Sequence, residues 1–158
     1  MGTATIAPYW NEFQAGLPAG SPYRGAAWNA ETFGDSAELA DELANLVLDG
    51  TKCATCSALW AWQADREPVA EPGRLTILLD GRNDPVCIVE TTEVAIRPFD
   101  EVDARFARDE GEGDRSLAHW RAVHEAFFRR SLPTIGKAFT PDMPLVCERF
   151  RVIHRRHG

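Results

Sequence analysis

The sequence predicts an α+β fold, built as a small mixed β-barrel decorated with helices. A capped helical pattern is followed by several stretches with strand-like alternation, and a last alternating stretch returns near the C-terminus. Helical and strand patterns do not alternate regularly, which argues against a doubly wound parallel sheet. The chain has 158 residues, of which 44% are hydrophobic and 26% charged, and this suits the core of one globular domain. We therefore expect a single domain over residues 1–158.

Residues 1–30 are expected to form an aromatic and Pro/Gly-rich extension that packs on this domain. The spacing of Tyr9, Trp10 and Phe13 predicts a short helical turn whose aromatic side chains face the core. The stretch from Gly16 to Gly25 contains too many glycine and proline residues for regular structure, so it predicts a loop.

A helix and a strand are predicted on either side of Gly50. Asp35 and Glu38 have the spacing of a capping pair, with Asp35 as the N-cap. Leucine and valine then recur on one helical face, and Gly50 supplies the left-handed residue that often ends a helix. The stretch from Cys56 to Trp62 alternates and includes aromatic residues, which predicts a half-buried strand.

A hairpin and a short helix are predicted next. Leu75–Leu79 is a short apolar run, Asp80-Gly81 is a turn signal, and the alternation from Pro85 to Ile96 predicts the return strand. Val102 and Phe106 have the i, i+4 spacing of a short helix that packs on the core.

A long helix and a final strand are predicted in the C-terminal third. Asp114 is expected to cap a helix from Arg115 to about Arg130, and Leu145–His154 is expected to be a strand after a loop. His124 and Phe128 are expected on the flank of the helix. The expected core stripe consists of Leu117, Trp120, Val123 and Phe127.

The charge and the lack of targeting patterns limit the function classes. A net charge of −7 argues against a protein that coats nucleic acid nonspecifically. No apolar run has the length of a membrane span, and the N-terminus lacks a basic segment followed by an apolar one. We expect a cytoplasmic protein with no membrane contact and no obligate protein partner.

The spacing of the four cysteines favours reduced side chains in or near strands, with metal binding as the less favoured alternative. Cys53 and Cys56 have the spacing of a zinc or redox pair, but the other two cysteines are solitary and form no second pair. His119 and His124 lie five residues apart, which is the wrong spacing for two ligands on one helical face. His124 is therefore expected beside a helix rather than at a metal.

The corner between the first predicted helix and strand carries the clearest chemical signal. If Lys52 lies in the turn after the helix, its side chain can reach the Thr55 hydroxyl, as in a nucleophile–base pair or an oxyanion site. The competing interpretation is a solvated cation near a helix C-terminus. Glu110 and Glu112 lie in a glycine-bearing segment, where they form either a proton shuttle for this set or a solvated acidic loop.

Several motifs, taken in order, form a pattern over roughly residues 10–153. They are Phe33-Gly34-Asp35, Val47-Leu48-Asp49-Gly50-Thr51-Lys52-x-x-Thr55, Ile77-x-Leu79-Asp80-Gly81, Glu90-Thr91-Thr92-x-Val94, Pro98-Phe99-x-x-Val102-x-x-x-Phe106-Ala107, Asp109-Glu110-Gly111-Glu112-Gly113-Asp114-Arg115-Ser116-Leu117-x-x-Trp120-Arg121-x-x-His124 and Cys147-Glu148-Arg149-Phe150-x-Val152. This pattern resembles the ASCH domain family and is most similar to its bacterial YhfF-like branch.

The resemblance implies a PUA-like β-barrel whose cleft between barrel and helices is associated with RNA binding. Some ASCH proteins hydrolyse the amide of N4-acetylcytidine, and others are reported as ribonucleases. In the amidohydrolases a Gly-x-Lys-x-x-Thr pattern carries an active-site lysine and threonine, which Lys52 and Thr55 match. The family's catalytic glutamate is matched best by Glu110, with Glu112 as the alternative.

The expected function is metal-independent amide hydrolysis on an N4-acylated cytosine nucleoside or a related ligand, by Lys52, Thr55 and Glu110. The alternatives are a ribonuclease acting on single-stranded RNA and a noncatalytic module that binds RNA or a nucleotide. The ligand is thus a nucleoside or short RNA, and no cofactor is implied. The residues expected to bind substrate are Phe33, Asp35, Ser57, Glu112, Arg115 and Glu148.

Two mechanisms are open at this level. If Thr55 attacks the substrate, Lys52 must be neutral to accept its proton, which requires burial. If water attacks instead, Glu110 is the base and a charged Lys52 stabilises the oxyanion.

Overall fold

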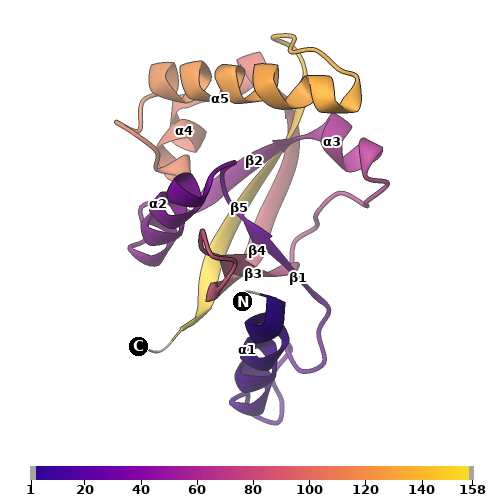
Figure 1. The fold of residues 1–158 in the computed structure, drawn as a ribbon, viewed down its shortest axis with the longest axis vertical. Helices are drawn as coiled ribbons and strands as arrows, with labels where there is room; N and C mark the ends of the chain where they lie inside the picture. The colour runs from indigo at the N-terminus through magenta and orange to yellow at the C-terminus, as the bar shows by residue number, and fades with distance from the viewer. Residues whose placement is uncertain (1–2, 157–158) are drawn as a thin grey trace. The chain divides into compact units, whose positions relative to one another are not determined.

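The computed structural model describes residues 3–156, which contain five α-helices, two 3-10 helices and five strands (Figure 1). The α-helices are α1 (Thr3–Ala15), α2 (Ala37–Leu48), α3 (Leu59–Ala64), α4 (Ala104–Glu110) and α5 (Leu117–Ser131), and the 3-10 helices are η1 (Phe99–Glu101) and η2 (Leu132–Ile135). The strands are β1 (Trp28–Thr32), β2 (Ala54–Ala58), β3 (Leu75–Leu79), β4 (Pro85–Pro98) and β5 (Pro144–Arg155).

The strands are hydrogen-bonded in the order β1-β3-β4-β5-β2. β1 pairs with β3 in parallel, whereas β3 pairs with β4, and β2 with β5, in antiparallel fashion. The sheet is therefore mixed, and the predicted α+β class is confirmed. The described residues fall into two compact units, and β4 and β5 each contribute a segment to both.

The first unit comprises the chain up to Gly50, Gly73–Thr91 and the residues from Arg151 onward. Its core joins aromatic side chains of α1 to apolar side chains of β3 and β4. The prediction that the N-terminal aromatic residues face the core is confirmed, and α1 is longer than the single turn expected. The buried residues of this core are Tyr9, Trp10, Phe13, Leu75, Ile77, Leu79 and Ile88.

Helix α2, also in the first unit, begins at a different cap from the one predicted. The N-cap is Ser36, whose side chain accepts a hydrogen bond from the backbone N–H of Leu39 at 3.1 Å. Asp35 lies one residue too early, so its prediction as the cap is wrong. Both residue types cap helices well, and the sequence alone does not decide between neighbours. Gly50 does follow the helix in the left-handed region, with φ +85°, as predicted.

Strand β1 was not predicted. None of its five residues is buried, so it lacks the alternation that marks a half-buried strand. It forms a parallel ladder with β3, from Trp28 opposite Leu75 to Thr32 opposite Leu79. The partner strand rather than its own pattern therefore specifies it.

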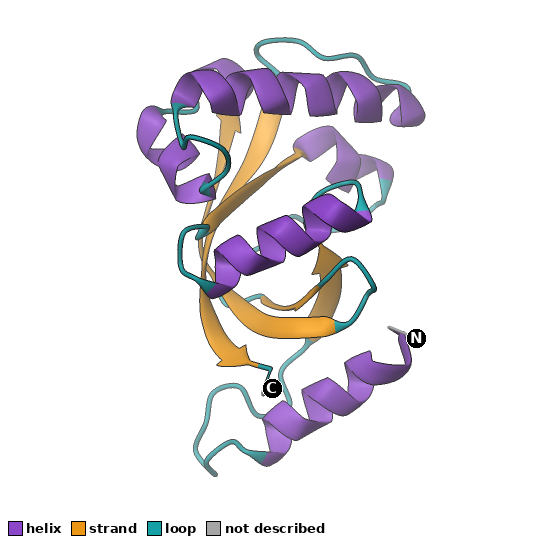
Figure 2. Ribbon diagram, turned by 60° about the vertical axis from the view of Figure 1, so that its left-hand side comes forward, coloured by secondary structure: helices purple, strands orange, loops and turns teal. Residues whose placement is uncertain are grey.

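The second unit comprises Thr51–Pro72 and Thr92–Phe150 and has its own core around Trp120. The Trp120 ring lies 5.3 Å from that of Phe99 and 6.5 Å from that of Phe106. These contacts fix α5 against α4 and η1, and Figure 2 shows the two α-helices close together. Because α4 also contacts β2, this packing positions the loop after α4 at the β2 edge.

The predicted strand from Cys56 to Trp62 is wrong in its second half. β2 ends at Ala58, and Leu59–Ala64 forms the short helix α3. Trp62 Nε1 donates to Ser57 Oγ at 2.8 Å, which ties the helix back to the strand. A short stretch with tryptophan at alternate positions fits both a strand and a helix, so the spacing of its apolar residues does not distinguish the two.

The long helix is confirmed, but its cap and its buried face differ from the prediction. Ser116, not Asp114, is the N-cap, and its hydroxyl accepts from the backbone N–H at position 119. Val123 is 39% exposed, whereas Phe128, expected on the flank, is 1% exposed and lies in the core. Trp120 is buried as predicted.

Candidate functional site

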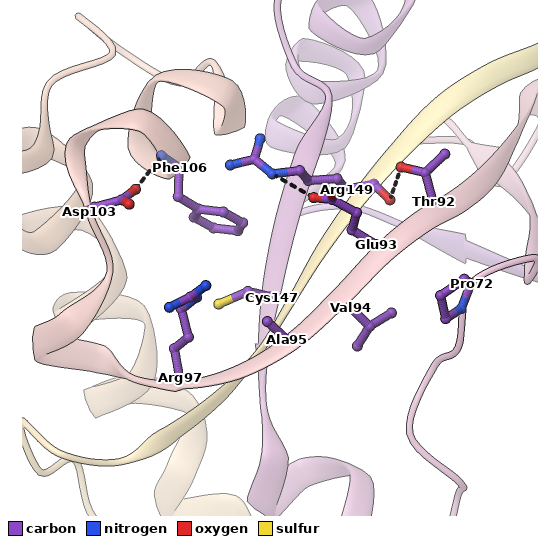
Figure 3. A pocket seen from close by; sticks show the side chains of 10 residues that line it. All are labelled: Pro72, Thr92, Glu93, Val94, Ala95, Arg97, Asp103, Phe106, Cys147 and Arg149. Carbon is purple, nitrogen blue, oxygen red and sulfur yellow. Dashed lines mark hydrogen bonds and ion pairs between the residues drawn. The ribbon is translucent and has the colours of Figure 1, made fainter.

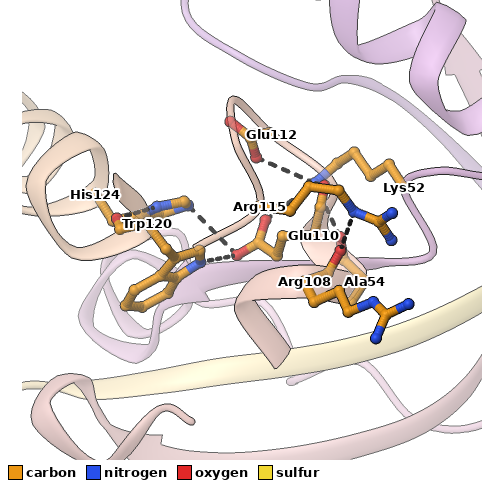
Figure 4. Close-up of polar contacts among 8 residues, drawn as sticks. All are labelled: Lys52, Ala54, Arg108, Glu110, Glu112, Arg115, Trp120 and His124. Carbon is orange, nitrogen blue, oxygen red and sulfur yellow. Dashed lines mark hydrogen bonds and ion pairs between the residues drawn. The ribbon is translucent and has the colours of Figure 1, made fainter. Parts of the chain in front are cut away.

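A buried lysine lies at the centre of the second unit's polar network (Figure 4). Lys52 is 2% exposed. Its Nζ donates to the carbonyl oxygen of Ala54 at 2.8 Å, to Glu110 Oε1 at 2.9 Å and to Glu112 Oε2 at 3.3 Å. The interpretation of Lys52 as a solvated cation is therefore wrong.

Glu110 is the equally buried partner of this lysine. Its Oε1 binds Lys52, while its Oε2 accepts from Trp120 Nε1 at 2.7 Å and lies 3.3 Å from His124 Nε2. Figure 4 shows the carboxylate between the lysine on one side and the two rings on the other. Buried carboxylates need this kind of satisfaction, because an unpaired one would cost several kcal/mol.

The end of α4 and the loop after it bring Glu110 and Glu112 to Lys52. Asp103 caps α4 by accepting from the backbone N–H of Phe106, and Gly111 ends the helix with φ +78°. A Cβ at Gly111 would lie 2.6 Å from the carbonyl oxygen of Thr51, so the two backbones approach closely there. The backbone N–H of Cys53 also donates to the carbonyl oxygen of Asp109 at 2.8 Å. Together these contacts dock the loop on the chain that carries Lys52.

The ion pair keeps both of its members charged. Burial lowers the pKa of Lys52, but the nearby carboxylates of Glu110 and Glu112 outweigh it, and the pKa lies above its ordinary value. Burial raises the pKa of Glu110, but Lys52, His124 and Trp120 stabilise the carboxylate and hold the pKa well below its usual range. A neutral Lys52, as required for attack by Thr55, is thus disfavoured.

The same network raises the pKa of both Glu112 and His124, but for different reasons. Burial raises the pKa of Glu112, the neighbouring Glu110 carboxylate raises it further, and Lys52 compensates only in part. Burial lowers the pKa of His124, but its contact with Glu110 leaves the net pKa above the ordinary value. The Glu112 side chain is 18% exposed. It is thus the more accessible of the two carboxylates on Lys52.

A thiol and an imidazole complete the cluster. The Sγ of Cys56, an Oε of Glu110 and a ring nitrogen of His124 all lie within 4.8 Å of one another, an arrangement that could hold a metal ion. The pKa of Cys56 lies well above its ordinary value, because burial and the Glu110 carboxylate both disfavour the thiolate.

Thr55 lies next to this cluster on β2. It follows Ala54, whose carbonyl oxygen accepts from Lys52, and it pairs with Glu148 of β5. Since strand side chains alternate, Thr55 and Glu148 project from the face opposite to Cys56. Ser57 lies on the same face as Thr55, with its hydroxyl bound to a tryptophan of α3. The structure thus places Thr55 one residue from an Ala54 oxygen that accepts from Lys52.

The other expected ligand-binding residues are spread more widely. Arg115 lies just after the loop with φ +65°, and its Nε donates to the carbonyl oxygen of Arg108 at 3.0 Å. Phe33 and Asp35 belong to the first unit, in the connection between β1 and α2. Their role in binding remains a prediction.

Trp120 and His124 are neighbours of Glu110, and the sequence did not indicate this contact. Both belong to the motif pattern, with Trp120 expected as a core residue and His124 beside a helix, and both contact the same Glu110 oxygen. Their i, i+4 spacing on α5 was the available signal, because it stacks the two rings with centroids 4.3 Å apart. That spacing does not reveal which carboxylate they meet.

A cavity of about 480 Å³ lies elsewhere in the second unit, and Lys52 does not line it (Figure 3). Phe106 and Cys147 provide apolar surface, and the guanidinium groups of Arg97 and Arg149 provide positive charge. Arg149 pairs with Asp109 and Glu93. The full lining consists of Pro72, Thr92, Glu93, Val94, Ala95, Arg97, Asp103, Phe106, Cys147 and Arg149.

Over the described residues 3–156, no helix combines the length and the apolar character needed to cross a membrane.

Comparison with known proteins gives a family and a fold. The family model of the ASCH domain matches residues 29–154. The crystal structure of the ASCH domain from Lactobacillus crispatus JV V101 is 30% identical, with a TM-score of 0.89 and 94% of each chain covered. Protein EF3133 from Enterococcus faecalis V583 is 33% identical, with a TM-score of 0.83 over 97% of this chain and 90% of its own. No curated protein matches.

A more distant structure, hypothetical protein PH0355, is 16% identical with a TM-score of 0.53, and it supports the fold alone. The PUA-like fold of ASCH domains, which is often linked to RNA binding or hydrolysis, agrees with the architecture of this chain. The narrower YhfF-like assignment remains a prediction. Because the family model covers most of the sequence, including the whole Lys52 network, the chain belongs to the ASCH domain family.

Proposed function

We propose that this protein is a hydrolase that cleaves the amide of an N4-acylated cytosine nucleoside or a closely related ligand. The observation that carries the proposal is the Lys52 ammonium, which is buried, held charged by Glu110 and contacted by the more accessible Glu112. A fixed cation in a site of low dielectric is suited to stabilise the oxyanion that forms when an acyl carbonyl is attacked. Membership of the ASCH family supports the same chemistry.

In this proposal the two glutamates have different roles. Glu110 is a positioning residue, since both of its oxygens are already bound and its pKa is held low. Glu112 is the proton carrier, because its carboxylate is partly exposed and burial raises its pKa above the ordinary value. This reverses the expected preference for Glu110 as acid and base. Displacement of Glu112 by the substrate gives the acyl oxygen access to Lys52.

Water is the nucleophile in this scheme. Glu112 removes a proton from water, the hydroxide adds to the acyl carbon, and Lys52 stabilises the oxyanion. The C–N bond then breaks as the acyl C=O forms again, N4 of cytosine receives the proton from Glu112, and the free nucleoside leaves with a carboxylic acid, which ionises by giving its proton to solvent. A charged Lys52 cannot accept the hydroxyl proton of Thr55, so Thr55 is not the nucleophile in this scheme.

The test is incubation of the purified protein with N4-acetylcytidine across a range of pH, with release of cytidine followed by chromatography. Lys52→Met should abolish release. The matched control is Lys137→Met, at the only other lysine of the chain, which is exposed and should leave the rate unchanged. No release by the wild-type protein at any pH would contradict the proposal, and an acyl adduct on Thr55 in mass spectra would contradict attack by water.

A second candidate is a module that binds RNA or a nucleotide without turnover. The cavity of about 480 Å³ favours it, because its volume suits a small ligand and it joins the aromatic ring of Phe106 to two arginines. This candidate gains if cytidine 5′-monophosphate binds with unchanged affinity in Lys52→Met and loses affinity in Arg97→Ala. Cleavage of labelled single-stranded RNA would instead favour the ribonuclease alternative.

A further inference from the structure

We propose that Cys56, Glu110 and His124 form a binding site for one zinc-class divalent cation. The three donor atoms come from β2, the end of α4 and the middle of α5, and all lie within 4.8 Å of one another. The inference does not depend on the hydrolase proposal, because a cation can bind there whether or not an amide is cleaved.

The distances between donor atoms suit a small cation. In a tetrahedral site, nitrogen and oxygen ligands about 2.0–2.2 Å from zinc lie roughly 3.4 Å apart. His124 Nε2 and Glu110 Oε2 are already 3.3 Å apart. The Cys56 sulfur, which needs a Zn–S distance of about 2.3 Å, lies within 4.8 Å of the donor atoms of Glu110 and His124.

The imidazole already presents the correct nitrogen. His124 Nδ1 lies 2.8 Å from the carbonyl oxygen of Trp120, and a carbonyl oxygen only accepts, so Nδ1 carries a proton. Nε2 is thus the nitrogen that faces Glu110 and can bind a metal. Zinc-ligating histidines commonly have their second nitrogen fixed in this way.

Trp120 supports two of the three ligands at once. Its backbone oxygen orients His124, and its Nε1 donates to Glu110 Oε2 at 2.7 Å. Such outer contacts hold ligating groups in place before the metal arrives. They are made within the core of the second unit, where Trp120 is 2% exposed.

Lys52 does not compete for the same oxygen atom. Its Nζ binds Glu110 Oε1, which leaves Oε2 for the metal side of the carboxylate. With Cys56 as a thiolate, the site contains three negative groups (Cys56, Glu110 and Glu112) and one positive group, the Lys52 ammonium. The net charge of these four groups is −2, which matches a divalent cation. A thiolate and an imidazole favour zinc-class metals over magnesium or calcium.

Local spacing does not predict this ligand set, because the set uses one member of the Cys53/Cys56 pair and one of the two helical histidines. The ligands are 54 and 14 residues apart along the chain (110 minus 56, and 124 minus 110). Folding rather than local spacing brings them together.

The test is titration of the full-length protein with Co²⁺ as a spectroscopic probe, followed by displacement with Zn²⁺. We expect one Co²⁺ per chain, a sulfur-to-cobalt charge-transfer band, and loss of that band on addition of Zn²⁺ but not of excess Mg²⁺. Cys56→Ser should remove the band, and His124→Gln should weaken binding at least tenfold. The matched controls are Cys53→Ser and His119→Gln, which lie outside the cluster and should retain both.

Three results would overturn the site. They are no stoichiometric Co²⁺ binding by the wild-type protein, a band that survives in Cys56→Ser, and a band that disappears in Cys53→Ser. Circular dichroism of each variant shows whether it folds. If Cys56→Ser does not fold, alkylation of the wild-type protein decides instead: bound Zn²⁺ should protect Cys56 but not Cys53 from iodoacetamide, and equal labelling with and without zinc would contradict the site.

Discussion

The buried Lys52 ammonium donates hydrogen bonds to oxygen atoms of the protein. The acceptors are the Ala54 carbonyl oxygen at 2.8 Å, Glu110 Oε1 at 2.9 Å and Glu112 Oε2 at 3.3 Å. Burial of one charge is costly, and only the paired carboxylates make it tolerable. Because the carboxylate partners lie 58 and 60 residues further along the chain, the sequence could indicate the lysine through its motif but not its burial. The role of Trp120 and His124 was likewise hidden, since each reads locally as an ordinary helix residue.

Chemical modification at the residue scale tests this burial. The chain has two lysines, and native protein treated with an amine-acylating reagent should be modified at the exposed Lys137 and protected at Lys52. Peptide mapping by mass spectrometry measures both sites in one sample. After denaturation in urea both should react. Equal labelling of the two lysines in the native protein would show that Lys52 is accessible to solvent.

The pKa of Glu110 predicts an acid limb in the stability curve. As the pH falls below about 4.5, the ordinary value, the unfolded chain takes up this proton before the folded chain does. The stabilisation is thus present above that pH and is lost as the pH falls. Glu110→Gln should make the loss of unfolding free energy between about pH 5 and pH 3 shallower, as measured by urea titration.

Glu112 is the control, because its pKa is shifted in the opposite direction. The folded chain holds this proton more tightly, so its contribution is present below the ordinary value and is lost as the pH rises through the raised pKa. Glu112→Gln should therefore not make the acid limb shallower, in contrast to Glu110→Gln. An acid limb unchanged by Glu110→Gln would contradict the ionised state assigned to Glu110.

The elements that carry the site were predicted better than their ends. Apolar spacing indicated the short helix near Val102 and Phe106 and the long helix, because each buries one face. The hairpin from Leu75 was indicated by a continuous apolar run, because β3 is buried at all five of its residues. β1 and α3 were not predicted, because neither contains a buried residue and so neither shows a clear apolar pattern. Helix caps also differed by one or two residues, where adjacent Asp and Ser compete for the same role.

The turn that ends α4 is predicted to tolerate only glycine. Gly111→Ala meets a left-handed φ and places a Cβ 2.6 Å from the Thr51 oxygen, so it should destabilise the protein and loosen the loop on Lys52. Gly136 is the matched control, with φ +73° and open space around its Cα. Gly136→Ala should cost about 1–2 kcal/mol and Gly111→Ala measurably more, as judged by denaturant unfolding. Equal costs would show that the close approach is unimportant.

The long helix offers a packing test of the same kind. Trp120 is 2% exposed and Val123 is 39% exposed, although both were expected in the core stripe. Trp120→Ala should destabilise by about 3–5 kcal/mol, because it leaves a cavity and frees a Glu110 oxygen. Val123→Ala should change stability by less than about 0.5 kcal/mol. A large effect of Val123→Ala in thermal unfolding would show that the buried face has been misassigned.

The two units of the whole molecule have separate cores, and the Lys52 network lies entirely in the second one. The second unit also contains most of the proposed site residues, so the proposed hydrolytic site needs no residue of the first unit. These residues are Lys52, Thr55, Ser57, Glu110, Glu112 and Glu148. The family resemblance indicated these residues, whereas physical patterns alone left a solvated lysine as the competing interpretation. No sequence pattern predicted that both oxygens of Glu110 accept hydrogen bonds whereas Glu112 is partly exposed.

A structure of the protein bound to N4-acetylcytidine tests the central claim most directly, and Glu112→Gln is the variant to use because it should bind the ligand while slowing its turnover. The account predicts the acetyl oxygen within hydrogen-bond distance of Lys52 Nζ, about 2.8–3.0 Å, with Glu110 still bound to Lys52 and residue 112 displaced. Ligand found only in the cavity beside Arg97, with the contacts of Lys52 unchanged, would contradict it.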